Sequence, residues 1–195
     1  MEVSQLYIYP IKSLAGIAVS KAKVTDRGLE FDRRWVLVDE HNYHVTQREM
    51  PILGTLVPEV TTFGIKVKNS RNEESILIPF KPLKEEKIQI ESWEDVFEGI
   101  EVSENISRWF TEIIGKNVRL MFQPEDSKRS IEAKFQIKGD EIVSAADGFP
   151  ILMISEESLL NLFCPFNKST YLPHSIDCLG PRKHKSFTVH RQKMP

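Results

Sequence analysis

Cationic side chains, hydroxyl groups and turn-forming residues gather within the first fifty positions of this chain. Lys12 and Ser13 come two and three residues after Pro10, and Arg33 and Arg48 follow between strand-like runs. Proline restricts its own φ and favours an extended residue before it, so the chain can turn sharply here. An ammonium, a hydroxyl, backbone N–H groups and a planar guanidinium together suit the oxygens of a phosphate. The spacing therefore predicts an anion-binding site.

A plainer interpretation of the same residues stays open at this point. A Pro-Ile-Lys-Ser turn occurs on many protein surfaces, and the run Asp32-Arg33-Arg34 is typical of a solvated strand end. Exposed ion pairs of that kind contribute only about 0 to 1 kcal/mol. Because short motifs often mislead, residue chemistry alone does not decide between the two interpretations.

The residues of the predicted anion site belong to a series of motifs spread along the chain. In order, these are Tyr9-Pro10-Ile11-Lys12-Ser13 with Gly16, Gly28-Leu29, Asp32-Arg33-Arg34-Trp35-Val36-Leu37-Val38, Val45-Thr46-Gln47-Arg48 and Ser144-Ala145-Ala146-Asp147-Gly148-Phe149-Pro150. This series resembles the MOSC proteins, the family of molybdenum cofactor sulfurase carboxy-terminal domains. The resemblance runs from Val3 to about Phe163, and favours the branch of the amidoxime-reducing component and its bacterial relatives.

The resemblance implies a cofactor, an activity and a set of binding residues. In the family, the first-motif lysine and serine and the first arginine after the aspartate hold the phosphate and pterin of the molybdenum cofactor (molybdopterin). Six positions of this chain are thereby implied to bind that cofactor: Lys12, Ser13, Arg33, Arg48, Gly148 and Phe149. The implied activity is reduction of N-hydroxylated compounds or sulfur transfer. A partner protein carrying a flavin, an iron–sulfur cluster or a haem is implied as electron donor.

Short apolar runs separated by turn formers indicate an antiparallel sheet or barrel. The expected strands cover residues 6–8, 19–24, 35–39, 64–68, 75–79, 87–91 and 150–154. One helix is predicted from an N-cap at Ser103 to a stop at Gly115, because apolar residues follow helical spacing between them. We assign Trp109 and Phe110 in this helix to the core rather than to a ligand. A second N-cap is expected at Ser155.

The expected fold is α+β and mainly β, with three parts. Residues 1–122 form an antiparallel β-barrel-like MOSC N-terminal domain with a packed helix, and residues 123–163 form a connector and the start of a MOSC β-barrel domain. Residues 164–195 form a basic, divergent or disordered tail with nine Lys, Arg or His residues and one acid. The family's Asn-x-Arg-Pro-Asn segment and its later molybdenum-binding cysteine are not recognisable, which predicts an incomplete, apparently truncated catalytic centre.

Cys178 is the one thiol weighed as a metal ligand. Soft sulfur suits molybdenum, and His174 lies four residues before it. Two residues at that spacing make a weak metal signal, so an ordinary thiol is favoured. His41 and His44 are expected to be exposed on one face of a hairpin turn rather than to bind a metal.

Composition bounds the remaining possibilities. A net charge of −2 and a pI near 6.2 do not favour nucleic acid as a partner. We expect no signal peptide and no membrane span, since no apolar run approaches roughly 20 residues. Two cysteines indicate a reducing, cytoplasmic setting. The alternatives to a cofactor protein are a non-catalytic β-barrel binding module, a degenerate paralogue without cofactor and, last, an RNA-associated protein with a basic tail.

Overall fold

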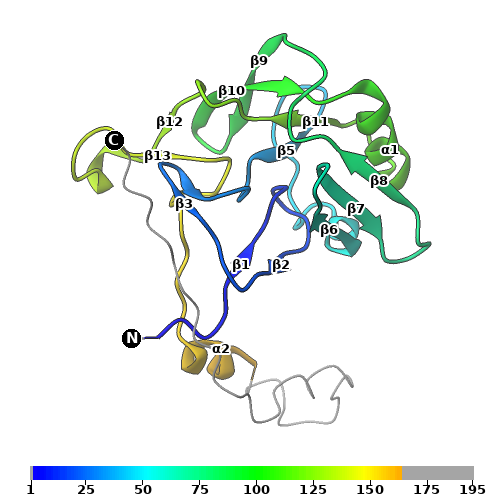
Figure 1. The fold of residues 1–195 in the computed structure, drawn as a ribbon. Helices are drawn as coiled ribbons and strands as arrows, with labels where there is room; N and C mark the ends of the chain where they lie inside the picture. Colours follow the sequence, from blue (N-terminus) through cyan, green and yellow to red (C-terminus); the bar gives the residue numbers. More distant parts are fainter. Residues whose placement is uncertain (1, 164–195) are drawn as a thin grey trace.

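A four-stranded antiparallel sheet forms the centre of the molecule (Figure 1). The computed structural model describes residues 2–163. Across the sheet the strands are β5 (Trp35–Val38), β11 (Arg119–Phe122), β10 (Asp95–Glu101) and β9 (Lys87–Ser92). Every residue of β5 is buried, as a continuous apolar run predicts for a strand covered on both faces. The predicted strands at 35–39 and 87–91 are therefore confirmed.

A second antiparallel sheet packs beside the first. It contains β6 (Leu56–Val60), β7 (Ile65–Asn69) and β8 (Ser75–Ile78), and the 3-10 helix η1 (Pro51–Thr55) leads into it. In β7, Ile65 and Val67 are buried while Lys66 and Lys68 are exposed. This period of two places one face of the sheet on the hydrophobic core.

Within residues 2–163, three short two-stranded ladders accompany the two larger sheets. They pair β1 (Tyr7–Ile8) with β2 (Ile17–Ala18), β3 (Val24–Thr25) with β4 (Gly28–Leu29), and β12 (Arg129–Ser130) with β13 (Ile142–Val143). A single strand over 19–24 was expected, and that prediction is wrong. Val19 donates its N–H to Leu6 just past the first ladder, and the chain then turns before pairing again at Val24. The result is a curled half-barrel that is mainly β, as predicted.

Helix α1 (Glu104–Ile114) covers one end of the sheets (Figure 1). Phe110 is fully buried, and the partly buried Trp109 packs against the same core, which confirms their assignment to packing. The helix stops at Gly115, whose φ of 74° is left-handed and suits glycine. Ser103 is extended as an N-cap should be, although its side chain makes no capping hydrogen bond.

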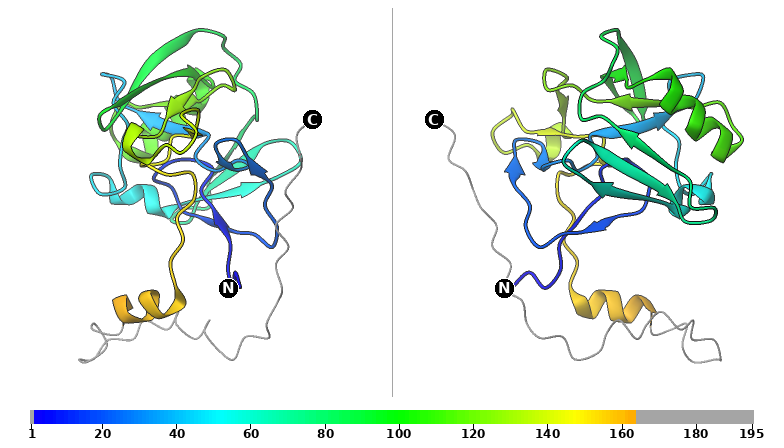
Figure 2. Two further views of the ribbon diagram at one scale, coloured as in Figure 1. Left: turned by 90° about the vertical axis from the view of Figure 1, so that its left-hand side faces the viewer. Right: turned by 45° about the vertical axis from the view of Figure 1, so that its right-hand side comes forward.

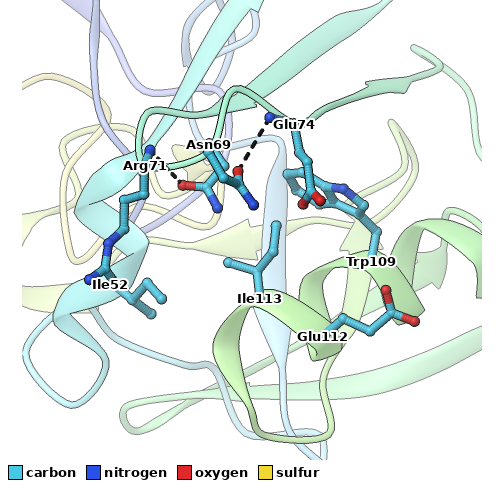
Figure 3. Close-up of a pocket in the computed structure, with 8 residues that line it drawn as sticks. Ile52, Asn69, Arg71, Glu74, Trp109, Glu112 and Ile113 are labelled. Atoms are coloured by element: carbon cyan, nitrogen blue, oxygen red, sulfur yellow. Dashed lines mark hydrogen bonds between the residues drawn. The ribbon is translucent and has the colours of Figure 1, made fainter.

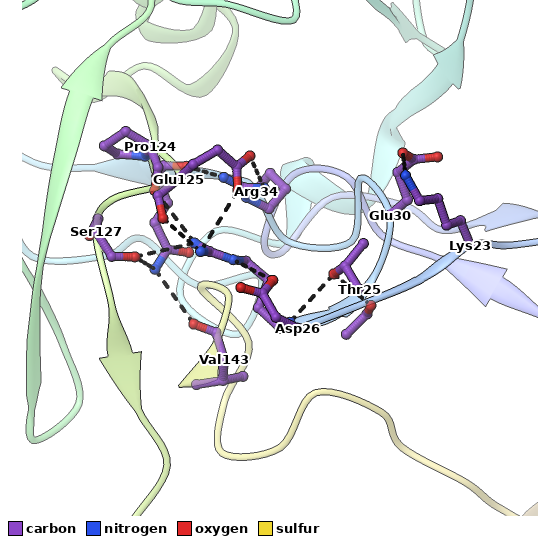
Figure 4. Close-up of polar contacts among 12 residues, drawn as sticks. Lys23, Thr25, Asp26, Glu30, Arg34, Pro124, Glu125, Ser127 and Val143 are labelled. Atoms are coloured by element: carbon purple, nitrogen blue, oxygen red, sulfur yellow. Dashed lines mark hydrogen bonds and ion pairs between the residues drawn. The ribbon is translucent and has the colours of Figure 1, made fainter. Parts of the chain in front are cut away.

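The segment after β11, with Pro124, Glu125 and Ser127 labelled in Figure 4, is held to the β structure by a buried arginine. Arg27 is buried, and its guanidinium donates to the carbonyl oxygens of Ser127 at 3.2 Å and Glu125 at 2.8 Å. Gln123 donates to the carbonyl oxygen of Val143 at 3.5 Å. The 3-10 helix η2 (Ala133–Phe135) follows in the same region. The expected connector is thus packed against the β structure.

Residues 148–163 extend away from both sheets (Figure 2). The predicted strand over 150–154 is wrong, because these residues have no strand partner among those described and remain largely exposed. Helix α2 (Glu156–Phe163) follows, and Ser155 accepts a hydrogen bond from the N–H of Ser158 at 3.0 Å, which confirms the N-cap. Cys178, His174 and the predicted tail lie outside the described residues. No helix within residues 2–163 is long and apolar enough to cross a membrane.

Candidate anion-binding site

Two turns carry Lys12 and Arg33 to the same part of the half-barrel. Ile11 forms a parallel bridge with Trp35, and the Lys12 N–H donates to the Trp35 carbonyl at 2.8 Å. The Arg33 N–H donates to the Tyr9 carbonyl at 2.8 Å. Ser13 and Arg33 both have left-handed φ values, of 71° and 50°. These conformations are uncommon for residues other than glycine and mark both turns as sharply shaped.

Lys12 is buried and paired with a carboxylate far away in the sequence. Its exposed fraction is 6%, and its Nζ lies 2.6 Å from Oδ1 of Asp147, a residue whose side chain is 78% exposed. Burial lowers the pKa of Lys12, the bond to Asp147 opposes this, and the charges of Arg129 and Arg33 lower it further. Burial alone would raise the pKa of Asp147, but the hydrogen bond and charge of Lys12 bring it below its ordinary value.

Arg129 holds the segment that carries Asp147. Its buried guanidinium donates to the carbonyl oxygens of Ser144 at 3.0 Å, Asp147 at 2.9 Å and Ala146, and it pairs with the carboxylate of Asp95 at 2.5 Å. The backbone of the same segment is tied to the other side of the site, since the Ala145 N–H donates to the Arg33 carbonyl at 3.0 Å. Arg129 and the Arg33 backbone therefore fix residues 144–147 beside Lys12.

Trp93 connects this ion pair to Arg48. It sits in the β9–β10 turn with a φ of 58°, and its Nε1 donates to Oδ1 of Asp147 at 3.2 Å. The guanidinium carbon of Arg48 lies 5.1 Å from the centre of the Trp93 ring, within the range of a cation–π contact. Arg48 is thus joined to the site through an aromatic side chain rather than directly.

His44 corrects one prediction. It was expected to be exposed beside His41, but it is only 1% exposed, while His41 lies at the surface. Residues three apart in extended chain face opposite sides, so the two histidines cannot share a face. The His44 ring packs 4.8 Å from that of Trp93, and within the described part of the chain neither ring nitrogen has a hydrogen-bond partner. Burial lowers the pKa of His44, and the charge of Lys12 adds to that effect.

A cleft of about 660 Å³ opens beside Asp147. Its lining includes Trp93, Asp95, Arg129, Asp147 and Gly148. Of the six residues implied to bind a cofactor, Gly148 lines this cleft. Lys12 contacts Asp147 at the cleft, and Ser13 follows Lys12 in its turn.

The side chains of Phe149 and Arg34 make their contacts away from Lys12. The Phe149 ring is half-exposed and packs 5.0 Å from the Phe135 ring, so the structure does not bring this side chain to Lys12. Arg34 pairs with the Glu125 carboxylate at 2.7 Å and donates to the Gln123 carbonyl, as part of the network in Figure 4. Arg34 is therefore directed to the Glu125 network, whereas the charge of Arg33 acts on Lys12 and its guanidinium lies over the Tyr9 ring, 5.2 Å from the ring centre.

The donors at Lys12 suit an anion with several oxygens. An ammonium has three N–H donors. Within residues 2–163, the Lys12 ammonium makes one hydrogen bond, to Asp147, and the Ser13 hydroxyl makes none. Arg33 pairs with Asp32, but a guanidinium carries five N–H donors, so some of them remain for another acceptor. The described part of the chain, residues 2–163, contains no group of three or more His, Cys, Asp or Glu side chains able to hold a metal ion.

The sequence analysis did not predict three residues of the candidate site: Trp93, Arg129 and Asp147. Asp147 lies in a motif that the sequence analysis noted, but an acid is not an obvious member of an anion site. A buried lysine needs a counter-ion, but the burial of Lys12 is visible only in the structure, so the sequence offered no direct signal for Asp147 as its partner.

A second cavity of about 430 Å³ lies next to helix α1 (Figure 3). Trp109 and Ile113 project into it from the helix, and Asn69, Arg71 and Glu74 border it from the β7–β8 turn. None of the predicted site residues lines this cavity. Within residues 2–163, the candidate site is therefore the region of Lys12 and Asp147, whose cleft Gly148 lines.

The fold is a curled β half-barrel, and its candidate site contains a buried lysine paired with an exposed aspartate. The chain belongs to the family of the MOSC N-terminal beta barrel domain, whose family model matches residues 1–117. The family resemblance seen in the sequence is thereby confirmed.

Several characterised MOSC proteins are similar to this chain. Mitochondrial amidoxime-reducing component 1 of Mus musculus is 31% identical over 172 residues, which cover 82% of this chain and 49% of that protein. Molybdenum cofactor sulfurase of Homo sapiens is 29% identical over 175 residues, covering 86% of this chain and 20% of that protein. The chain therefore spans about half the length of the first relative and a fifth of the second.

Proposed function

We propose that this chain binds the molybdenum cofactor through the phosphate and pterin of that molecule. The observation that carries the proposal is the buried Lys12 ammonium, which makes one hydrogen bond among the described residues and whose pKa the charges of Arg129 and Arg33 lower. A buried ammonium is unfavourable unless an anion compensates it, and here the compensating group is the exposed Asp147 carboxylate, which an external anion could replace. The names of the relatives, an amidoxime-reducing component and a molybdenum cofactor sulfurase, support this cofactor as the anion.

Each residue has a distinct role in the proposed complex. Lys12 supplies positive charge, Ser13 supplies a hydroxyl donor, and Arg33 grips two phosphate oxygens at once. Open space lies beside Gly148, since a Cβ added there would meet no atom within 4 Å. This space leaves room for a planar ring to approach the backbone. When bound, the cofactor supplies two-electron chemistry at its metal, while these residues bind and orient it.

The reaction class of the proposed function is reduction of N-hydroxylated compounds, with sulfur transfer as the other possibility that the relatives' names support. A reductase needs an electron donor, and we propose a protein carrying a flavin, an iron–sulfur cluster or a haem for this role. Both cysteines of the chain, Cys164 and Cys178, lie outside the described residues, so no metal ligand is assigned.

Cofactor copurification tests the proposal. The protein is coexpressed with the enzymes that make the cofactor, and molybdenum and pterin are measured per mole of purified protein. Lys12→Ala and Arg33→Ala are each expected to lower retention about tenfold or more, because each removes charge-assisted hydrogen bonds of roughly 1.5 to 3 kcal/mol. Lys116→Ala is the matched control, since Lys116 is an exposed lysine whose one ion pair among the described residues is with Asp39, at 3.4 Å.

Two outcomes would contradict the proposal. Retention in Lys12→Ala equal to that in Lys116→Ala would show that the buried ammonium does not hold the cofactor. Wild-type protein free of both molybdenum and pterin after coexpression would favour the non-catalytic β-barrel binding module. Circular dichroism of each variant verifies that the β structure is retained.

A further inference from the structure

We propose that Asp147 is an internal competitor that occupies the anion position on Lys12 and so determines which anions the site accepts. This inference rests on the proposed function to the extent that it places the ligand's anionic group at Lys12. It adds a residue that selects among anions, and it predicts how the site rearranges when an anion binds.

The positions of the two charges support competition. Asp147 Oδ1 lies 2.6 Å from the Lys12 Nζ, so it occupies the hydrogen-bonding position that a phosphate oxygen would take at about 2.7 to 2.9 Å. Lys12 is buried, whereas the Asp147 side chain is exposed and lines the cleft. An anion that enters from the cleft therefore meets the Asp147 carboxylate before it reaches the ammonium.

The Asp147 side chain can leave without unfolding its segment. Its backbone carbonyl is held by Arg129 at 2.9 Å, and the carbonyl of Ser144 is held by the same guanidinium at 3.0 Å. These contacts do not involve the Asp147 carboxylate. Among the contacts within residues 2–163, rotation of the side chain into the solvent breaks the hydrogen bonds from Lys12, at 2.6 Å, and from Trp93, at 3.2 Å.

Competition of this kind selects by charge and by the number of oxygens. A carboxylate fixed in the same chain has a high effective concentration at Lys12, so a free monoanion with two oxygens gains little by replacing it. A phosphate dianion brings more charge and additional oxygens, which can reach Ser13 and Arg33 as well. Asp147 therefore makes the site selective for phosphate over acetate.

Trp93 provides a direct signal of displacement. The chain has three tryptophans, and Trp93 is the one whose indole N–H is bonded to Asp147. When Asp147 leaves Lys12, this hydrogen bond is lost and the indole resonance in a ¹⁵N–¹H spectrum must shift. A Trp93→Phe variant assigns the resonance.

The experiment titrates the full chain with inorganic phosphate and, separately, with acetate at constant ionic strength. Three proteins are compared: wild type, Asp147→Asn and Glu94→Gln. Glu94 is the matched control, because it lines the same cleft, is exposed, and has no hydrogen bond or ion pair within residues 2–163. Asn keeps an oxygen acceptor for Lys12 while removing the charge that competes with the anion.

We expect phosphate to bind Asp147→Asn about tenfold more tightly than wild type, the scale of one charge-assisted hydrogen bond. Acetate should bind measurably to Asp147→Asn and not to wild type. Glu94→Gln should stay within about threefold of wild type, since exposed charges interact weakly through water. In wild type, phosphate should shift the Trp93 indole resonance at the same midpoint as binding.

The possible failures separate the two proposals. Phosphate binding that is equal in wild type and Asp147→Asn, or that leaves the Trp93 resonance unmoved in wild type, overturns the competitor role and leaves the proposed function standing. Absence of phosphate binding in both proteins overturns the anion site and hence both proposals. An equal gain in Glu94→Gln also overturns the competitor role, because general charge would then explain the effect.

Discussion

Replacing Arg129 by lysine tests whether one buried guanidinium supports the whole site. Arg129 makes five hydrogen bonds, two to Asp95 and one each to the carbonyls of Ser144, Ala146 and Asp147. A lysine ammonium has three donors and no fork, so at least two of these bonds are lost. Each charge-assisted bond contributes roughly 1.5 to 3 kcal/mol, and losses within one network are less than additive. We expect Arg129→Lys to lower the free energy of unfolding by about 2 to 4 kcal/mol.

Urea unfolding followed by tryptophan fluorescence measures that loss for Arg129→Lys. Arg27→Lys is the matched control, because Arg27 is equally buried and also donates to carbonyl oxygens, those of residues 124, 125 and 127. Both variants should lose stability, but only Arg129→Lys should also shift the Trp93 indole resonance. A loss below about 1 kcal/mol in Arg129→Lys, or the same resonance shift in both variants, would refute the role given to Arg129.

The other predictions concern three single positions. Gly64→Ala should lower the free energy of unfolding, measured with urea, by more than about 2 kcal/mol. Gly64 has a φ of 155°, and a Cβ there would lie 2.1 Å from the Ile78 carbonyl oxygen. Gly115→Ala should lower the free energy of unfolding by only about 1 kcal/mol, because a Cβ at Gly115 would meet no neighbour. Gly115→Asn should lower it less, since asparagine tolerates a left-handed φ. Equal losses in the two variants would contradict this explanation. Burial lowers the pKa of His44, so the unfolded chain binds a proton first and wild-type stability should fall as pH drops through about 6.5. His44→Phe should lose that part of the pH dependence, and a slope identical to wild type in urea melts at pH 5 to 8 would disprove it.

Local patterns in the sequence were sufficient for most of the regular structure. The helix ending at Gly115 follows from apolar spacing and a left-handed stop, and both are properties of consecutive residues. The alternation of Ile65, Lys66 and Val67 likewise places one face of β7 on the core. Lys12 and Arg33 were recognised as a pair because they lie in motifs close together in the chain.

Apolar character alone was not sufficient for the strand expected over residues 150–154. A strand requires a neighbouring strand to accept and donate its backbone hydrogen bonds, and the described residues supply none there. The prediction that His44 is exposed was wrong for a related reason. Its burial depends on the pairing of its N–H with the Glu91 carbonyl at 3.0 Å and on the Trp93 ring, both far along the chain.

The sequence by itself determined which cations are available and where the chain turns to present them. Only the tertiary structure decided what those cations meet. Lys12 and Asp147 are 135 positions apart, and their 2.6 Å contact exists because Arg129 and the Arg33 backbone hold residues 144–147 against the half-barrel. Periodicity and capping report on neighbours in the chain, whereas a buried ion pair depends on how distant segments pack.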